Sequence, residues 1–574
     1  MSTTSDSRPI VTVEMKDANI QCKRTVIHCG GKTRYIVLIQ GALLLAIFMA
    51  SIVCWNPAMI VLTDIKTSPI YDSSKNQTAE DFNNPSLPYR DRRIPYSTFQ
   101  KSVNYAVLYV GALMGVVPLN MMLQKFGTHK VMIGISLICI ITTALTPWAA
   151  VTNFYLLLVV RLFQGTTLSN PFPVIGSITN SWSSLKESGV FVALLTGYLQ
   201  ISSIFTMPVS GIIAAQIGWD LVFYVHAIIG IVLMILWSYN FRDEPWKHPF
   251  VNDREWRLIS VGKPNIKLHY KPPYKKIFSS LSIWGVWLAT CANYFVAQFA
   301  ITYTPLYFVY VNGMTVTAAS MLSTIPLLFQ LLIKLLTGVL SDKLDKISEV
   351  TKMRFFNTLA FWGCGFSLIL AGALPTFSSS FTASLIILGT SLQAFSAGGF
   401  TKGAVLVAKQ FSPQVMAVMQ VRGFTKGAVL VAKQFSPQVM AVMQVILCLS
   451  LFTGSFIVPT LTPKNEHSEY AIVFYLYGGW LIISNVIFCY FNDGKPAPWT
   501  EIPPSETSSK NPSRNVSKHI KVKIADSAPT IIPPSSTTIN SSNLPANIPP
   551  LLENNPKDIN TEGGINPSNP INNV

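Results

Sequence analysis

Long uninterrupted runs of apolar residues dominate the chain between residues 35 and 491. A helix of about 20 apolar residues crosses a bilayer, so each run has the length of a membrane span. The pattern predicts two sets of six membrane-spanning helices. They lie near 35–62, 103–123, 131–151, 154–180, 188–215 and 220–241, and then near 281–311, 315–340, 355–375, 381–408, 438–460 and 469–491.

The polar segments between the runs predict which side of the membrane each part faces. The central segment, 242–278, carries nine Lys and Arg residues against four acids and follows an even number of spans. Because basic loops stay on the cytosolic side, this segment and both termini are predicted to be cytosolic. The expected parts are a tail 1–34, an amino-terminal half 35–241 with an extracellular or lumenal loop 63–101, a cytosolic loop 242–278, a carboxyl-terminal half 279–491, and a disordered tail 492–574.

The composition excludes several classes of protein. The chain is 50% hydrophobic and 12% charged, whereas soluble domains carry about 25% charged residues. A soluble enzyme, a secreted disulfide scaffold and a disordered chain are therefore excluded, and the net charge of +17 reflects basic cytosolic loops rather than nucleic-acid binding. The first run is too long for a cleaved signal peptide. The eight cysteines lie in the first tail or inside apolar runs, so we expect no structural disulfide.

Two local features of the sequence affect the expected topology. Asn76 begins an Asn-Gln-Thr acceptor in the long loop, and we predict that it is glycosylated, the alternative being an unused acceptor. Residues 399–421 recur identically at 423–445, which indicates a recent duplication or a faulty gene model, or else a looped-out or re-entrant insert. A thirteenth span through the repeat would bury Arg422 and Lys426 at about 2.5–3.5 kcal/mol each, so twelve spans are favoured.

Several motifs occur in a fixed order along the spans. RDEPWKHPFVNDREWRLI follows the sixth run, YKKIFSSLSIWGVWLA leads into the seventh, and VRLFQGTT, IGWDLVFYVHAIIGI, LTGVLSDKL and FNDGKPAPW agree with them. The ordered set resembles the anion:cation symporters of the major facilitator superfamily, which include sialin, the vesicular glutamate transporters and the sodium–phosphate cotransporters. The resemblance covers about residues 35–499. It implies an all-α membrane protein with the twelve-helix major facilitator fold and transport of a small anion by alternating access.

Some positions depart from that family. Its members carry an arginine two residues before the helix-1 asparagine, where this chain has Cys54, and an acid in helix 4, where it has Leu168. The family's late helix-10 His and Asp fall on Ala404 and Leu406. These differences motivate an alternative function, a non-transporting pseudo-transporter that acts as a membrane receptor or scaffold.

The candidate chemistry lies in basic residues inside the spans. All 26 acids fall in tails, loops or helix ends, so no carboxylate is expected at mid-membrane depth. A buried cation then needs another counter-ion, and an anionic substrate supplies one. Arg161, about 10 Å into the fourth span, has a planar fork that suits a carboxylate or phosphate, and the resemblance also implicates this helix-4 arginine. The alternative is a structural arginine bonded to backbone carbonyls.

Other candidates carry open alternatives. Lys334 either contacts substrate or extends to the cytosolic surface, Lys402 is a weaker candidate because it lies in the duplicated unit, and His226 either relays protons or packs as a neutral polar group. Asn56, Asn293 and Tyr303 are candidate lining residues, together with Tyr105, Tyr294 and Gln393, the alternative being hydrogen bonds between helices. Asp342 and Lys343 look like the superfamily's cytosolic gating motif, or form a plain solvated loop.

The sequence therefore predicts a secondary active or facilitative anion transporter rather than an enzyme. We expect no cofactor and no metal, a possible coupling ion that is either sodium or a proton, no nucleic-acid partner, and a monomer in the lipid membrane. The sequence does not identify the substrate, and it is compatible with the plasma membrane or with an intracellular vesicle or lysosome membrane.

Overall fold

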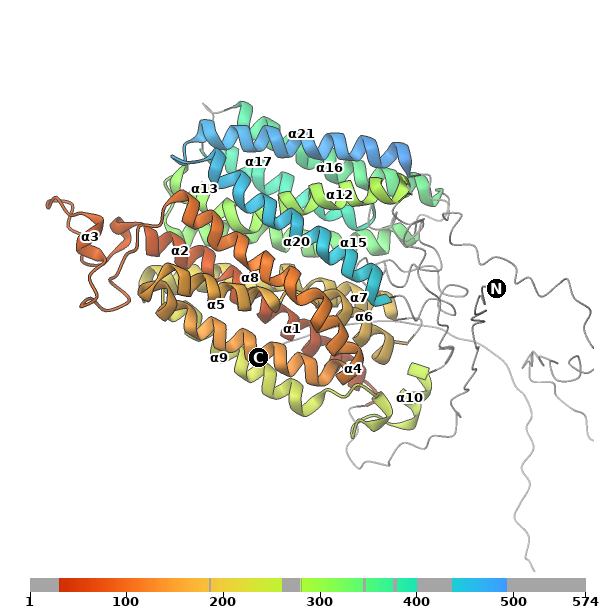
Figure 1. Cartoon of the computed structure of the whole chain (residues 1–574). Coiled ribbons are helices and arrows are strands. Elements are labelled where there is room, and N and C mark those ends of the chain that lie inside the picture. Colours follow the sequence, from red (N-terminus) through yellow and green to blue (C-terminus); the bar gives the residue numbers. More distant parts are fainter. Residues whose placement is uncertain are drawn as a thin grey trace, which may run out of the picture. The chain divides into compact units, whose positions relative to one another are not determined.

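The computed structural model describes residues 30–492 except 185–186, 261–278, 280, 344–346, 375–378 and 400–435. The chain divides into two units, Met1–Pro503 and Pro504–Val574, and the second lies outside the described residues. Within the described ranges every regular element is a helix (Figure 1).

In the amino-terminal half, three of the six spans are each divided into two helices. The first span is α1 and α2, the second and third are the two parts of α4 on either side of a kink at Gly127, the fourth is α5 and α6, the fifth is α7 and α8, and the sixth is α9. Their bounds are α1 Thr33–Val53, α2 Trp55–Thr63, α4 Thr98–Thr152, α5 Phe154–Thr166, α6 Pro171–Trp182, α7 Ser188–Thr196, α8 Tyr198–Gln216 and α9 Leu221–Asn240.

The carboxyl-terminal half repeats this arrangement. Its first span is α12, a π-helical turn η3 and α13, and its second span is α14 and α15. The last four spans are α16, then α17 with η4, then α20, and finally α21. The predicted end of the tenth span, 400–408, lies outside the described residues. The bounds are α12 Leu281–Gln298, η3 Phe299–Tyr303, α13 Thr304–Tyr310, α14 Val316–Leu322, α15 Thr324–Lys343, α16 Glu349–Ala373, α17 Ser379–Leu392, η4 Gln393–Ala397, α20 Ser436–Leu461 and α21 His467–Phe491.

Short helices mark the two ends of the bundle. The loop after the first span holds η1 (Ile65–Thr67) and α3 (Ala79–Phe82), and the central segment holds η2 (Pro245–Lys247) and α10 (Asp253–Ser260). Figure 1 shows α3 and α10 at opposite ends, here named the α3 end and the α10 end. The predicted alternation of loops across the membrane places them in the same way.

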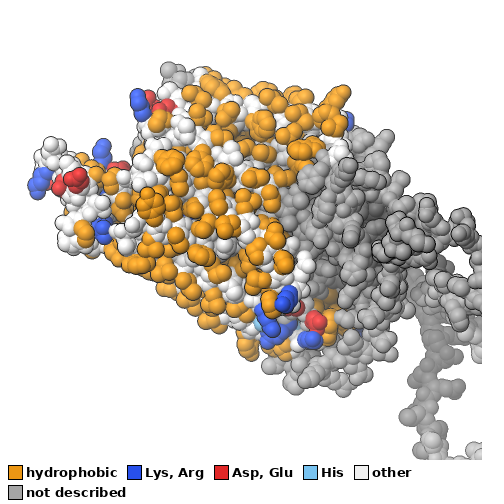
Figure 2. Space-filling model, viewed as in Figure 1, with side chains coloured by type: hydrophobic (Ala, Val, Ile, Leu, Met, Phe, Trp, Pro, Cys, Tyr) orange, Lys and Arg blue, Asp and Glu red, His pale blue; other side chains and the backbone are white. Residues whose placement is uncertain are grey.

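The surface has the character of a membrane protein. Nine helical segments among the described residues are long and apolar enough to cross a membrane, and α4 counts once although it holds two spans. The fourth and seventh predicted spans are interrupted by Thr167–Asn170 and by η3, and they fall outside the nine. Figure 2 shows a broad hydrophobic band across the visible face, with charged side chains toward the ends.

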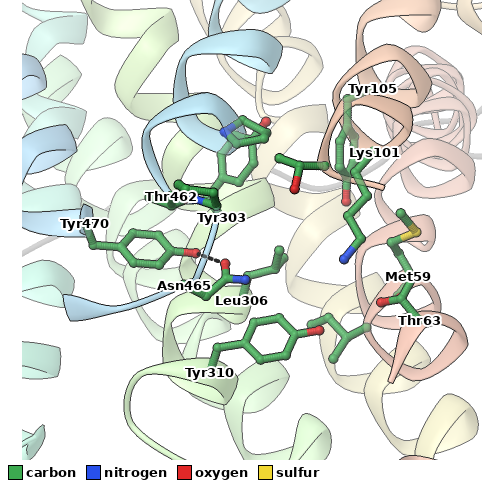
Figure 3. A pocket seen from close by; sticks show the side chains of 14 residues that line it. Met59, Thr63, Lys101, Tyr105, Tyr303, Leu306, Tyr310, Thr462, Asn465 and Tyr470 are labelled. Carbon is green, nitrogen blue, oxygen red and sulfur yellow. Dashed lines mark hydrogen bonds between the residues drawn. The ribbon is translucent and has the colours of Figure 1, made fainter. Parts of the chain in front are cut away.

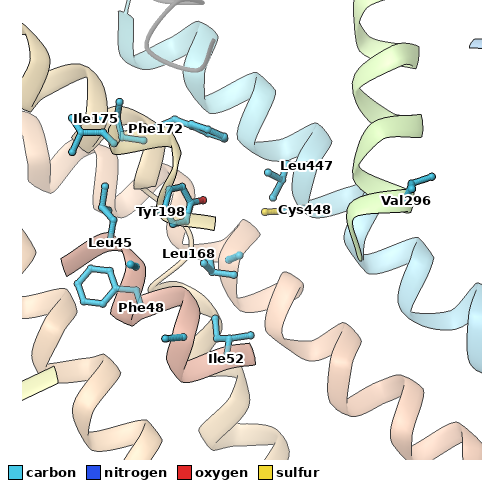
Figure 4. Packing of buried hydrophobic residues seen from close by; sticks show 14 of the residues in the cluster. Leu45, Phe48, Ile52, Leu168, Phe172, Ile175, Tyr198, Val296, Leu447 and Cys448 are labelled. Atoms are coloured by element: carbon cyan, nitrogen blue, oxygen red, sulfur yellow. The ribbon is translucent and has the colours of Figure 1, made fainter. Parts of the chain in front are cut away.

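The core joins the two halves. Leu45 and Phe48 of α1, Phe172 of α6 and Leu447 of α20 belong to one buried cluster (Figure 4). Because lipid tails are as apolar as these side chains, close packing and hydrogen bonds hold such helices together. Hydrogen bonds across the seam include Gln444 Nε2 to the Leu168 carbonyl oxygen at 2.8 Å, Gln200 Nε2 to Gln330 Oε1 at 3.3 Å and Asn56 Nδ2 to the Ile301 carbonyl oxygen at 3.0 Å.

Candidate functional site

The predicted fourth-span arginine lies at the contact between α4 and α5. A Cβ atom on Gly111 of α4 would overlap the carbonyl oxygen of Leu162, and one on Gly165 of α5 would overlap that of Leu108. Only glycine permits this approach of two backbones, which is how small residues bring membrane helices together. The approach places the side chain of Arg161 directly against α4.

Arg161 is fully buried, and its guanidinium is oriented by neutral groups. Nε donates to Oδ1 of Asn104 at 3.2 Å and Nη1 donates to Oε1 of Gln164 at 2.7 Å. Gln164 is held in turn by donating to the carbonyl oxygen of Ser51 at 2.9 Å. The guanidinium carbon lies 4.9 Å from the centre of the Trp55 ring, within the range of a cation–π interaction.

Several donors around this guanidinium lack an acceptor. Nη2 of Arg161, Nδ2 of Asn104, Nε1 of Trp55 and the hydroxyl of Tyr105 are buried and make no hydrogen bond to any described group. All four can donate a hydrogen bond, and three of them cannot accept one. They come from α2, α4 and α5.

Among the described residues no carboxylate pairs with Arg161. Ion pairs of that part of the chain include those of Arg34, Lys75 and Lys247. A buried charge is normally paired because removing it from water is costly. The arrangement of one unpaired cation and several unpaired donors can therefore accommodate an anion.

A cavity of about 70 Å³ lies on the α3 side of this cluster (Figure 3). Tyr105 of α4 and Tyr303 of η3 both line it, and their ring centroids are 6.1 Å apart in an edge-to-face arrangement. Because Tyr105 and Tyr303 come from opposite halves, this pair is a contact across the seam. The remaining lining residues include Met59, Thr63, Lys101, Leu306, Tyr310, Thr462, Asn465 and Tyr470.

The structure gives the other predicted lining residues specific partners. Asn56 donates across the seam to the carbonyl oxygen of Ile301, which lies in the π-helical turn η3. Tyr303 is buried with its hydroxyl 3.5 Å from the Ser455 carbonyl oxygen, and it lines the cavity. The Asn293 carbonyl accepts from Gln393, and its own Oδ1 is buried without a partner among the described residues.

The other basic candidates, Lys334 and His226, have hydrogen-bond partners outside the Arg161 cluster. Nζ of Lys334 donates to the Thr196 carbonyl oxygen at 3.3 Å, at the end of α7. His226 is buried, with Nδ1 2.8 Å from the Val222 carbonyl oxygen and Nε2 3.4 Å from the Thr206 hydroxyl. These contacts match those of a neutral imidazole that packs between helices.

The remaining predicted residues are Lys402, the pair Asp342 and Lys343, and the acceptor Asn76. Lys402 lies outside the described residues. Asp342 and Lys343 end α15, as the motif predicted, but their side chains are outside the description. Asn76 is exposed in the loop before α3, where an acceptor asparagine would be accessible, and its glycosylation stays a prediction.

Sequence reasoning missed most of the groups that surround Arg161. Trp55, Asn104 and Gln164 are ordinary polar or aromatic residues within apolar runs, and only the fold brings them to the guanidinium. Lys101 was also missed but had a usable signal, because it lies four residues before the predicted lining residue Tyr105 and therefore on the same face of a helix. Lys101 opens the second span just outside its predicted start at residue 103.

An ion cluster at the α10 end connects the start of α1 with the start of α7 and with α10. Arg34 donates through Nε and Nη2 to the two carboxylate oxygens of Glu187, each at 2.9 Å, and Glu255 of α10 accepts from the Arg34 backbone amide at 2.9 Å. Burial raises the pKa of Glu187, but hydrogen bonds from Arg34, Tyr35 and Ser184 outweigh it and lower this pKa to about 2.

The fold and the buried site together define a membrane transporter of the twelve-helix type. Residues 41–429 match the Major Facilitator Superfamily, and the chain belongs to this superfamily. Its members are transporters rather than enzymes.

Individual relatives are distant. The chain is 25% identical over 361 residues to mouse sodium-dependent phosphate transport protein 3, covering 61% of this chain and 73% of that one. It is 22% identical over 523 residues to vesicular glutamate transporter 1 of Xenopus tropicalis, covering 88% and 82%. Human sialin is 23% identical over 397 residues, covering 68% and 75%. The chain is thus distantly related to anion transporters, as its motifs predicted.

Solved structures confirm the predicted fold. The crystal structure of a D-xylose-proton symporter matches with a TM-score of 0.54 and 12% identity, covering 80% of this chain and 100% of that chain. The xylose transporter XylE from E. coli, in a partially occluded inward open conformation, matches with a TM-score of 0.52 and 12% identity, covering 79% and 97%. At this identity the likeness concerns the fold alone.

Proposed function

We propose that the protein moves a small organic or inorganic anion across the membrane by alternating access, with Arg161 binding the charge of the anion. The observation that carries the proposal is the fully buried guanidinium with no carboxylate partner among the described residues. An anion in this site would supply the missing counter-charge. The distant relation to transporters named for phosphate and glutamate supports the same class of substrate.

The unpaired donors extend this argument from charge to geometry. Nη2 of Arg161 and the neighbouring donors of Asn104 and Trp55 suit the several lone pairs of a carboxylate or phosphate. Arginine binds such groups through a planar fork, which a lysine cannot reproduce. Rocking of the halves would open the seam at Tyr105 and Tyr303 and so change access to the anion.

The coupling of transport is proposed from the same absence of acids. Proton-coupled carriers commonly use carboxylates inside the membrane, and this sequence has its acids in tails, loops and helix ends. We infer that flux follows the membrane potential or a sodium gradient rather than a proton gradient.

The experiment is an uptake screen with purified protein in proteoliposomes, across inorganic phosphate and small carboxylates, with and without sodium, voltage and pH gradients. Saturable uptake of one anion, lost in protein-free vesicles, is the expected result. Absence of uptake across the panel by well-folded protein would instead favour the receptor or scaffold alternative.

A further inference from the structure

The cavity at the α3 end contains one cationic side chain that the transport site does not use. Lys101 lies in the first turn of α4, is half-buried, and lines the cavity. Within the described part of the chain its ammonium group makes no hydrogen bond and no ion pair. Figure 3 shows its ammonium group pointing into the space between Thr63 of the amino-terminal half and residues of the carboxyl-terminal half such as Tyr310.

A second buried group also points into this cavity. Tyr105 is 5% exposed, its hydroxyl has no partner among the described residues, and Figure 3 shows that hydroxyl beside the Lys101 side chain. Lys101 and Tyr105 are four residues apart on α4, so they lie on one face, separated by about 6 Å along the axis. Asn104, next to Tyr105, accepts from Arg161. One helix thus leads from Lys101 to the proposed transport site.

The cavity contains little negative charge that would neutralise Lys101. Asp64, at the end of α2, is close enough for its charge to act on Lys101, but its Oδ1 accepts from the backbone amide of Lys66 at 3.0 Å and no ion pair with Lys101 forms. Asp64 is not among the lining residues, which apart from Lys101 are neutral and include Tyr303, Tyr310 and other residues of both halves. A cation in a partly water-excluded cleft attracts anions and raises their local concentration.

We propose that Lys101 and Tyr105 form an outer binding site, which captures a small anion from the α3 side before it reaches Arg161. The Tyr105–Tyr303 contact then separates the two sites, and its opening lets the anion pass from Lys101 to Arg161. The role of this outer site in transport rests on the proposed function. The attraction of anions into the cavity can be measured independently of transport.

The measurement uses a cysteine at Thr63, which lines the cavity, and compares its modification by an anionic and a cationic methanethiosulfonate reagent. With Lys101 present, the anionic reagent should react faster relative to the cationic one. Lys101→Gln should lower this ratio about tenfold, because removing one nearby charge slows the anionic reagent roughly threefold and speeds the cationic reagent roughly threefold. Lys101→Arg should keep the ratio.

Lys66→Gln is the matched control, since it removes the same charge from an exposed lysine at the same end. An equal fall in the ratio with Lys66→Gln, or no fall with Lys101→Gln, would overturn the proposal. Protein without the introduced cysteine corrects for native thiols, and Thr98, which also lines the cavity, provides a second reporter position if Thr63→Cys folds poorly.

Transport supplies the second readout for any anion that the uptake screen identifies. Lys101→Gln should raise KM for anion presented at the α3 side at least about fivefold and leave the maximal rate nearly unchanged. An equal loss of maximal rate would overturn the outer-site role. If no anion is transported, the thiol ratio still decides whether the cavity attracts anions, so failure of the proposed function is distinguishable.

Discussion

Two buried arginines in this bundle differ in the groups that surround their charges. Arg34, 7% exposed, has Glu187 and Glu255 as partners at the α10 end. Arg161 is fully buried and is oriented by the amide oxygens of Asn104 and Gln164, without a carboxylate among the described residues. The first is the pattern of a structural ion pair, and the second leaves a position for an anion.

The ion cluster makes a prediction about stability. Glu187→Gln should lower the free energy of unfolding by about 2 kcal/mol, because it leaves the buried Arg34 without its bidentate partner. The pKa of Glu187 is depressed to about 2, so its contribution is complete above the unfolded carboxyl pKa of about 4.3 and is lost as pH falls toward 2. Thermal unfolding in detergent at several pH values measures both effects.

The control for the cluster is Glu244→Gln, which removes an exposed ion-pair partner of Lys247 near the same end. It should change the Tm little, since exposed ion pairs contribute little. A Tm of Glu187→Gln equal to that of the parent protein at neutral pH would show that the cluster does not stabilise the fold.

The histidines lead to a prediction about coupling. Uptake should change little between about pH 5.5 and 7.5, the range in which histidine titrates. His226→Gln should leave this flat profile unchanged, because the glutamine can still donate to the Val222 carbonyl that His226 contacts. Initial uptake rates at fixed voltage measure the profile.

The pH prediction has a separate control at the α3 end. His467, the first residue of α21, lies 3.0 Å from the Tyr307 hydroxyl. Steep acid-dependent uptake that persists in His226→Gln and disappears in His467→Gln would contradict the proposed coupling and assign it to this second histidine.

At the scale of helices, periodicity predicts the spans well and their interruptions poorly. Apolar runs report burial in lipid, which is insensitive to the break at Cys54 or the π-helical turn at Phe299–Tyr303. The helix α4 begins at Thr98, five residues before the predicted start of the second span at residue 103, because Ser97 and Gln100 form a capping box. The amphipathic α10 was missed inside the basic central segment.

The candidate site was predictable only in part. Arg161 stood out because a charge within an apolar run is rare. Asn104 and Gln164 have no such signal, since polar residues in spans usually bond to neighbouring helices, as Asn56 does with Ile301. The Tyr105–Tyr303 contact depends on how the two halves meet, which single-span patterns do not contain.

The duplicated segment makes a prediction at the same scale. The second copy supplies Ser436–Val445, which begins α20, and Gln444 donates to the Leu168 carbonyl oxygen. Deleting Arg422–Val445 leaves the identical residues Ser412–Val421 to begin this helix. The variant should keep the parent Tm and uptake rate.

A second substitution checks the register of that deletion variant. Gln420→Ala should lower its Tm as much as Gln444→Ala lowers that of the full chain, because the two glutamines would occupy the same place. Loss of folded protein on deletion would show that the repeated segment is an essential part of the bundle.

At the scale of the whole molecule, the order of the spans predicts which termini and loops share a side. Asn76 should be glycosylated when the protein is made in cells, whereas Asn515 and Asn540 in the carboxyl-terminal tail should not be, because twelve spans leave that tail cytosolic. Glycosidase treatment followed by electrophoresis of Asn76→Gln measures this. A mobility shift that persists in Asn76→Gln and vanishes when Asn515 and Asn540 are also replaced would establish thirteen spans.

Arg161 is a buried cation without an acid partner among the described residues, and the most direct measurement of its proposed role in anion binding is uptake by Arg161→Lys in proteoliposomes. This substitution keeps the charge and removes the fork, so kcat/KM should fall at least about tenfold while the Tm and the size-exclusion profile stay near those of the parent protein. Arg93→Lys, which alters another buried arginine in the loop at the α3 end, should retain uptake. Parent-like affinity and rate in well-folded Arg161→Lys would contradict the account.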